Sequence, residues 1–95
     1  MKYNLSNKVI LITGASKGIG KAISFKLGAN GARTVLLSRN EEELKKVTDQ
    51  LINKGFQSIY HVADVSKLED LEKAVEYAKV KWNHQDIKIL GKCLL

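Results

Sequence analysis

The segment from Thr13 to Gly20 has the residue types and spacing best suited to a chemical task. It reads Thr-Gly-Ala-Ser-Lys-Gly-Ile-Gly, with glycines at positions 14, 18 and 20. An apolar run precedes it and helical spacing follows it, so these glycines lie where a strand turns into a helix. Without side chains, the backbone can approach a ligand closely, and the unpaired N–H groups of a helix N-terminus favour negative charge. The sequence therefore predicts a loop that binds a pyrophosphate.

Short apolar runs alternate with longer segments of helical spacing around this loop. The runs cover residues 9–12, 34–37, 58–62 and 87–90. The first two are apolar almost without interruption, as expected for strands that are covered on both faces. This alternation is typical of a parallel α/β sheet.

Three helices are expected between these strands. Asn40 with Glu43, and Ser66 with Glu69, have the capping-box spacing and predict the starts of the second and third helices. The apolar positions expected to be buried are Ile19, Ala22, Ile23 and Leu27 in the first helix, Leu44, Val47 and Leu51 in the second, and Leu68, Leu71, Val75, Ala78 and Trp82 in the third.

Right-handed crossovers place the first two helices on one face of the sheet and the third on the other. The implied strand order is 3-2-1-4. The sequence therefore predicts an α/β fold with a partial Rossmann-type parallel sheet and helices on both faces.

The Thr-Gly-x-x-x-Gly-x-Gly pattern of residues 13–20 resembles that of the short-chain dehydrogenases/reductases. A second match is Asp64-Val65, which is similar to the adenine-contacting Asp-Val pair of this family. The resemblance extends over about the first 90 residues. It implies that the Asp64 carboxylate accepts from the adenine amino group and that the Val65 N–H donates to the ring. The alternative is that Asp64 is a plain turn residue ahead of Ser66.

Cofactor choice is expected at the end of the second strand, where an acidic residue would accept from the ribose hydroxyls of NAD. This chain instead has Ser38-Arg39-Asn40. Arg39 offers a planar, charged group for a phosphate, Ser38 can donate its hydroxyl, and Lys17 could add a second cation. These residues predict NADP(H), and the alternative is that Arg39 and Lys17 are solvated surface charges.

The resemblance thus implies a cofactor site formed by the glycine loop and the ends of the second and third strands. Its expected members are Gly14, Ser16, Lys17, Gly18, Ile19, Gly20, Ser38, Arg39, Asp64 and Val65.

The catalytic motifs of the family are missing from this chain. The family's fourth strand normally ends in an Asn-Asn-Ala-Gly type motif, but residues 91–95 read Gly-Lys-Cys-Leu-Leu. The family's serine and Tyr-x-x-x-Lys pair belong to later elements. Tyr77 and Lys81 match that spacing by chance, since they fall on the third helix, with no strand and no candidate serine ahead of them in the required arrangement. We expect residues 1–95 to be the truncated N-terminal part of a dinucleotide-binding domain, with no turnover alone.

Composition argues against several other classes. No apolar run approaches the roughly 18 residues that span a bilayer, and no signal sequence is evident, so a cytoplasmic protein without membrane contact is expected. Cys93 is the single cysteine, which excludes an internal disulfide. His61 and His84 show no ligand spacing, so no metal is expected. The net charge of +6 comes from scattered basic residues, which disfavours nucleic-acid binding.

The expected function is the NADP(H)-binding portion of a short-chain oxidoreductase. Such an enzyme moves a hydride between NADPH and a carbonyl or alcohol substrate. One alternative is a non-catalytic dinucleotide-binding or interaction module. Another, from a different class, is a small basic nucleic-acid binder. Self-association of the chain stays open.

Overall fold

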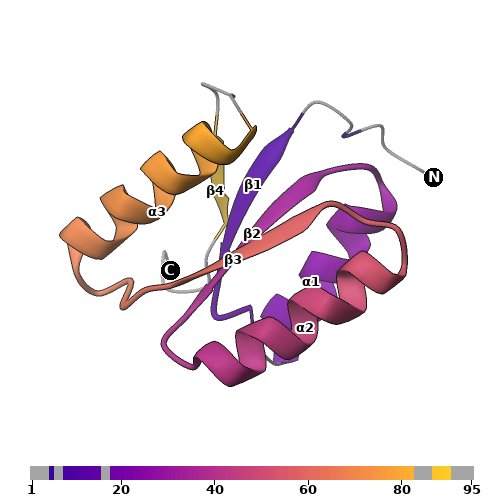
Figure 1. Cartoon of the computed structure of the whole chain (residues 1–95), viewed down its shortest axis with the longest axis horizontal. Coiled ribbons are helices and arrows are strands. Elements are labelled where there is room, and N and C mark those ends of the chain that lie inside the picture. The colour runs from indigo at the N-terminus through magenta and orange to yellow at the C-terminus, as the bar shows by residue number, and fades with distance from the viewer. Residues whose placement is uncertain (1–4, 6–7, 16–17, 83–86, 91–95) are drawn as a thin grey trace.

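The computed structural model describes residues 5, 8–15, 18–82 and 87–90. Strands and helices alternate along these residues (Figure 1). Their bounds are β1 Val9–Thr13, α1 Gly18–Ala29, β2 Arg33–Ser38, α2 Glu41–Asn53, β3 Ser58–Val62, α3 Leu68–Trp82 and β4 Ile87–Leu90. All strand pairs are parallel, and the order β3-β2-β1-β4 is the one expected from the sequence. The α/β fold class with a partial Rossmann-type sheet is confirmed.

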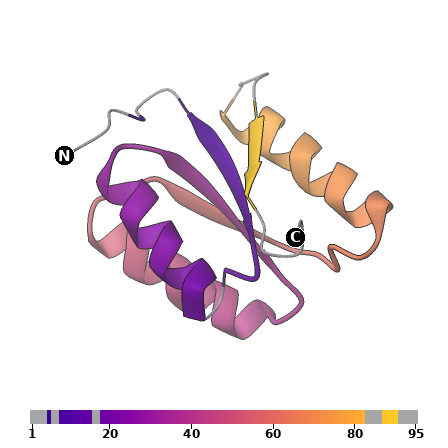
Figure 2. The same cartoon turned by 180° about the vertical axis from the view of Figure 1, so that it is seen from behind.

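Helices cover both faces of the sheet, with α1 and α2 on one side and α3 on the other (Figures 1 and 2). The α1 and α2 face buries a cluster that includes Ile10, Ile12, Leu36, Leu44, Val47 and Leu51. The α3 face buries Val9, Leu11, Val35, Leu37, Ala74 and Ala78. Because successive residues of β1 and β2 point to opposite faces, each strand must be apolar throughout.

The strand register brings the carboxyl ends of β1, β2 and β3 to one edge of the sheet. Thr13 pairs with Leu37, and Ser38 pairs with Val62. The segments predicted to bind a cofactor all follow these three strand ends. Ligands of open α/β sheets bind at this edge.

The buried face of α1 differs from the predicted one. The larger apolar residues were expected to face the sheet, yet Ile19 is 69% exposed. Small residues four positions apart are buried instead, namely Gly20, Ser24 and Gly28. They allow close packing, since a Cβ at Gly28 would lie 2.7 Å from Cδ2 of Phe56. Of the predicted residues, Leu27 packs partly buried against the cluster.

The second helix starts as predicted. The side chain of Asn40 accepts a hydrogen bond from the Glu43 N–H at 3.1 Å and caps α2. Leu44, Val47 and Leu51 are buried, so its predicted apolar face is confirmed.

The start of α3 differs from the prediction. The helix begins at Leu68, and the Ser66 hydroxyl donates to Asp64 Oδ1 at 2.6 Å. Ser66 therefore belongs to the preceding turn. Leu68 is 70% exposed, contrary to its predicted burial. The rest of the predicted stripe packs as expected against the α3-face cluster, namely Leu71, Val75, Ala78 and Trp82.

Candidate functional site

Two glycines between β1 and α1 have a backbone conformation that favours glycine. Gly14 and Gly18 have φ values of 62° and 60°, in the left-handed region where other residues are strained. Both glycines are exposed, whereas Ala15 between them is buried. Ser16 and Lys17 lie outside the described residues.

The N-terminus of α1 presents suitable groups for an anion. Its first backbone N–H groups have no acceptor inside the helix. No acidic side chain lies in the first turn, so the positive end of the helix dipole is not offset there. Ile19 is exposed in the same turn.

Gly20 brings this helix against the loop. A Cβ on Gly20 would overlap the carbonyl oxygen of Gly14 and lie 2.8 Å from its carbonyl carbon. The third glycine of the motif is therefore required by the contact between α1 and the loop.

The end of β2 carries the exposed Arg39. The preceding Ser38 is half-buried, and its Oγ accepts from the Asn40 N–H at 3.2 Å. A hollow is lined by Arg39, Asn40, Glu41 and Glu42. Among the described residues, no hydrogen bond or ion pair engages the Arg39 guanidinium. Arg39 is thus an accessible cation next to the strand end.

Asp64 follows β3 and is held by a tight turn. Its Oδ1 accepts from the Ser66 N–H at 3.0 Å and from the Ser66 hydroxyl at 2.6 Å. Its own N–H donates to Asp70 Oδ2 at 2.9 Å. This geometry agrees with the turn role that was the alternative for Asp64, and it leaves Oδ2 without a hydrogen bond from another described residue. The neighbouring Val65 packs partly buried against the α3-face cluster.

Hydrogen bonds and nearby charges lower the pKa of the Asp64 carboxyl. The Ser66 hydroxyl and the Ser66 N–H hold the pKa of its carboxyl below the ordinary value, although partial burial opposes them. The positive charges of Arg39 and Lys67 lower the pKa further. Because Arg39 acts on Asp64, the ends of β2 and β3 share one electrostatic environment.

Replacing Ser66 with alanine is expected to raise the pKa of Asp64, because the hydroxyl donor is the largest cause of the lowering. The backbone N–H remains and keeps part of the effect. An NMR titration of the Asp64 carboxyl carbon in both proteins measures the change. An unchanged or lower pKa in the variant would contradict this assignment of the cause.

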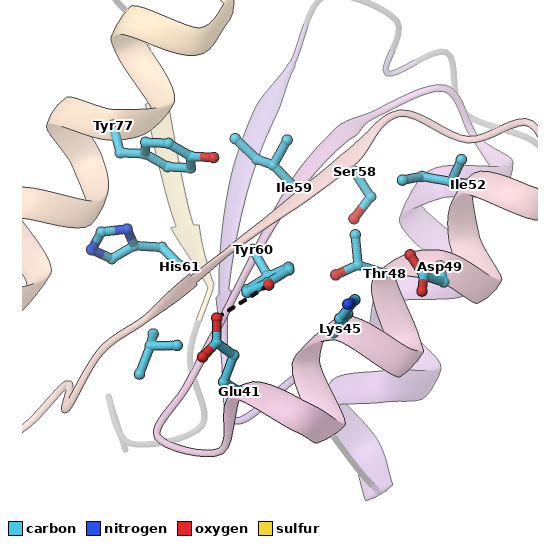
Figure 3. Close-up of a pocket in the computed structure, with 11 residues that line it drawn as sticks. Glu41, Lys45, Thr48, Asp49, Ile52, Ser58, Ile59, Tyr60, His61 and Tyr77 are labelled. Carbon is cyan, nitrogen blue, oxygen red and sulfur yellow. Dashed lines mark hydrogen bonds between the residues drawn. The ribbon is translucent and has the colours of Figure 1, made fainter.

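A separate groove of about 510 Å³ runs along the outer edge of β3 (Figure 3). It contains no residue of the predicted cofactor site and was not foreseen from the sequence. In it the Tyr60 hydroxyl donates to Glu41 Oε2 at 3.3 Å, and the rings of His61 and Tyr77 lie 5.3 Å apart. The groove joins side chains of α2, β3 and α3, and no sequence motif links them.

Within the described part of the chain, no helix is both long and apolar enough to span a membrane. The same residues contain no group of three or more His, Cys, Asp or Glu that could hold a metal ion. His84 and Cys93 lie outside the described residues.

The family profile described as short chain dehydrogenase matches residues 8–92. The uncharacterized oxidoreductase Lmo0432 of Listeria monocytogenes is 42% identical over 87 residues, which are 92% of this chain and 35% of that protein. The chain spans about a third of the length of curated relatives of this kind.

Solved structures of oxidoreductases have a similar fold. A metagenomic short-chain oxidoreductase in complex with NADP superimposes with a TM-score of 0.79 at 34% identity, over 88% of this chain and 38% of that one. An oxidoreductase from Haemophilus influenza with bound NAD also has a TM-score of 0.79, at 26% identity, over 83% of this chain and 28% of that one.

Proposed function

Because this chain belongs to the short-chain dehydrogenase family, we propose that it forms the adenosine and pyrophosphate site of an NADP(H)-dependent oxidoreductase. The complete protein would transfer a hydride between NADPH and a carbonyl or alcohol substrate. A bound nicotinamide would supply or accept that hydride. The observation that carries the choice of NADP(H) is the accessible Arg39, which stands at the end of β2 where an NAD site would have a carboxylate.

The residues present fit a dinucleotide. The absence of a Cβ at Gly20 lets α1 lie against the loop, and the N-terminus of α1 offers N–H donors for a pyrophosphate. Asp64 and Val65 are assigned to the adenine, with Oδ2 of Asp64 as the acceptor. Ser16, Lys17 and Ile19 complete the proposed loop site, and Ser38 lies beside Arg39.

Two carboxylates oppose a phosphate at this position, because Glu41 and Glu42 line the same hollow as Arg39. Their repulsion acts across solvent, where exposed charge pairs are worth about 0.2–1 kcal/mol. A charge-assisted hydrogen bond to the phosphate contributes about 1.5–3 kcal/mol. For the two carboxylates together the repulsion is about 0.4–2 kcal/mol, so the Arg39 contact is larger by about 1 kcal/mol at the middle of both ranges. NADP(H) is therefore favoured over NAD(H).

Cofactor preference tests the proposal directly. We expect the chain to bind NADPH about five-fold more tightly than NADH at low ionic strength, since about 1 kcal/mol corresponds to about five-fold in Kd. Titration followed by nicotinamide fluorescence gives both constants. Adenosine 2′,5′-bisphosphate should compete better than AMP, because it carries the 2′-phosphate. Equal affinities for NADPH and NADH would remove the basis for this choice, and no binding of either would refute the proposed site.

A further inference from the structure

Glu41 lies at the boundary between the proposed cofactor site and the groove beside β3. It is the first residue of α2 and it is exposed. It lines both the hollow that contains Arg39 and the groove of Figure 3. Its carboxylate can therefore lie on either side, and its position decides how much negative charge is near Arg39.

Tyr60 holds Glu41 on the groove side. The Tyr60 hydroxyl donates to Glu41 Oε2 at 3.3 Å, which Figure 3 draws as a dashed line. The ring of Tyr60 is half-buried and packs against the cluster beneath α1 and α2, so its position is fixed by β3. Burial, and then the charge of Glu41, raise the pKa of Tyr60, so its hydroxyl stays protonated and can donate at neutral pH.

The backbone around Arg39 is fixed independently of this contact. The Asn40 N–H donates to Ser38 Oγ at 3.2 Å, and the Asn40 side chain caps α2 through Glu43. Loss of the Tyr60 hydroxyl would therefore leave the loop in place. It would release only the Glu41 side chain, which could then pair with the Arg39 guanidinium two residues away.

We infer that Tyr60 is a positioning residue for cofactor selection, which keeps the Glu41 carboxylate on the groove side and leaves Arg39 available to a 2′-phosphate. This inference rests on the proposed NADP(H) site. Glu42 also lines the hollow that contains Arg39. The Tyr60 hydroxyl donates to Glu41, so loss of this hydrogen bond would not change the contribution of Glu42. Glu43 is half-buried, and its N–H donates to the Asn40 side chain that caps α2.

The test compares three variants with the wild-type chain. Tyr60→Phe keeps the ring and removes only the hydroxyl. We expect it to weaken NADPH binding by about 1.4- to five-fold, the range for one exposed ion pair. NADH binding should not change, because NADH has no 2′-phosphate. In Tyr60→Phe/Glu41→Gln the released side chain has no charge, so the loss caused by Tyr60→Phe should disappear, as a double-mutant cycle with Glu41→Gln measures.

Tyr77→Phe is the matched control. Tyr77 lines the same groove and its ring lies near that of His61, whereas the hydroxyl that donates to Glu41 is that of Tyr60. This variant should leave the affinities for NADPH and NADH unchanged. A second readout needs no cofactor: the NMR signal of the Arg39 Nε–H should shift in Tyr60→Phe and return in the double variant.

The outcomes separate this inference from the proposed function. Equal weakening of NADPH and NADH in Tyr60→Phe would assign Tyr60 a purely structural role and overturn the inference. Unchanged binding of NADPH, or a loss that persists with Glu41→Gln, would overturn it as well. A wild-type chain that does not prefer NADPH would instead refute the proposed cofactor choice, whatever the Tyr60 variants show.

Discussion

Replacement of Gly20 by alanine is expected to weaken NADPH binding by at least about ten-fold and to destabilise the fold. The added Cβ would overlap the Gly14 carbonyl oxygen and lie 3.0 Å from Cα of Ala15. These are backbone atoms, so the loop itself must move. Overpacking of this kind costs about 1–3 kcal/mol, whereas alanine regains only about 0.5–1 kcal/mol in a helix interior. Fluorescence titration and thermal unfolding measure the two effects.

Gly28→Ala in the same helix separates a loop effect from a general loss of stability. A Cβ at Gly28 would meet the side chain of Phe56, 2.7 Å from Cδ2 and 3.2 Å from Cβ, and would not touch the glycine loop. We expect this variant to lower the unfolding temperature while its NADPH affinity stays near that of the wild type. If Gly20→Ala binds NADPH normally, the loop does not hold the pyrophosphate.

The sheet could be predicted because strands that are buried on both faces consist of nearly continuous apolar residues. The expected strand at residues 9–12 becomes Val9–Thr13, and that at residues 34–37 becomes Arg33–Ser38. The strand order followed from crossover handedness, which holds for almost all parallel sheets. The N-cap of α2 could also be predicted, because the Asn40 side chain accepts from the Glu43 N–H only three residues away.

The packing of α1 was mispredicted because hydrophobic periodicity detects only large side chains. Here the buried residues of the helix are Gly20, Ser24 and Gly28. Cβ atoms at the two glycines would meet the loop after β1 and the side chain of Phe56. The Ser24 hydroxyl donates to the Gly20 carbonyl oxygen at 2.8 Å, so its burial leaves no unpaired polar group. Small residues repeated every four positions were the available signal. The exposed Ile19 shows that apolar character alone does not identify the buried face.

The candidate site could also be predicted only in part. The glycine loop and Arg39 could be assigned because they are contiguous in sequence with strand ends. The contact of Tyr60 with Glu41 could not, because it joins β3 to α2 across 19 residues of chain. The influence of Arg39 on the pKa of Asp64 also depends on strand order, which places β2 next to β3.

Arg39→Asp is expected to reverse the cofactor preference. It removes a charge-assisted contact to the 2′-phosphate worth about 1.5–3 kcal/mol, so NADPH affinity should fall by at least about ten-fold. The new carboxylate repels the phosphate and can accept from the ribose hydroxyls, so NADH should bind more tightly than in the wild type. The preference of the wild-type chain should also shrink as salt screens the exposed guanidinium.

Lys73→Asp makes the same change in net charge at an exposed position on α3, outside the hollow that contains Arg39. It should leave the ratio of the two affinities near that of the wild type, because the new charge lies outside the hollow and salt screens it from the 2′-phosphate. Measured dissociation constants for NADPH and NADH in the three proteins decide the question. If Arg39→Asp and Lys73→Asp have the same ratio, Arg39 is a solvated surface charge and the 2′-phosphate is not bound at the end of β2.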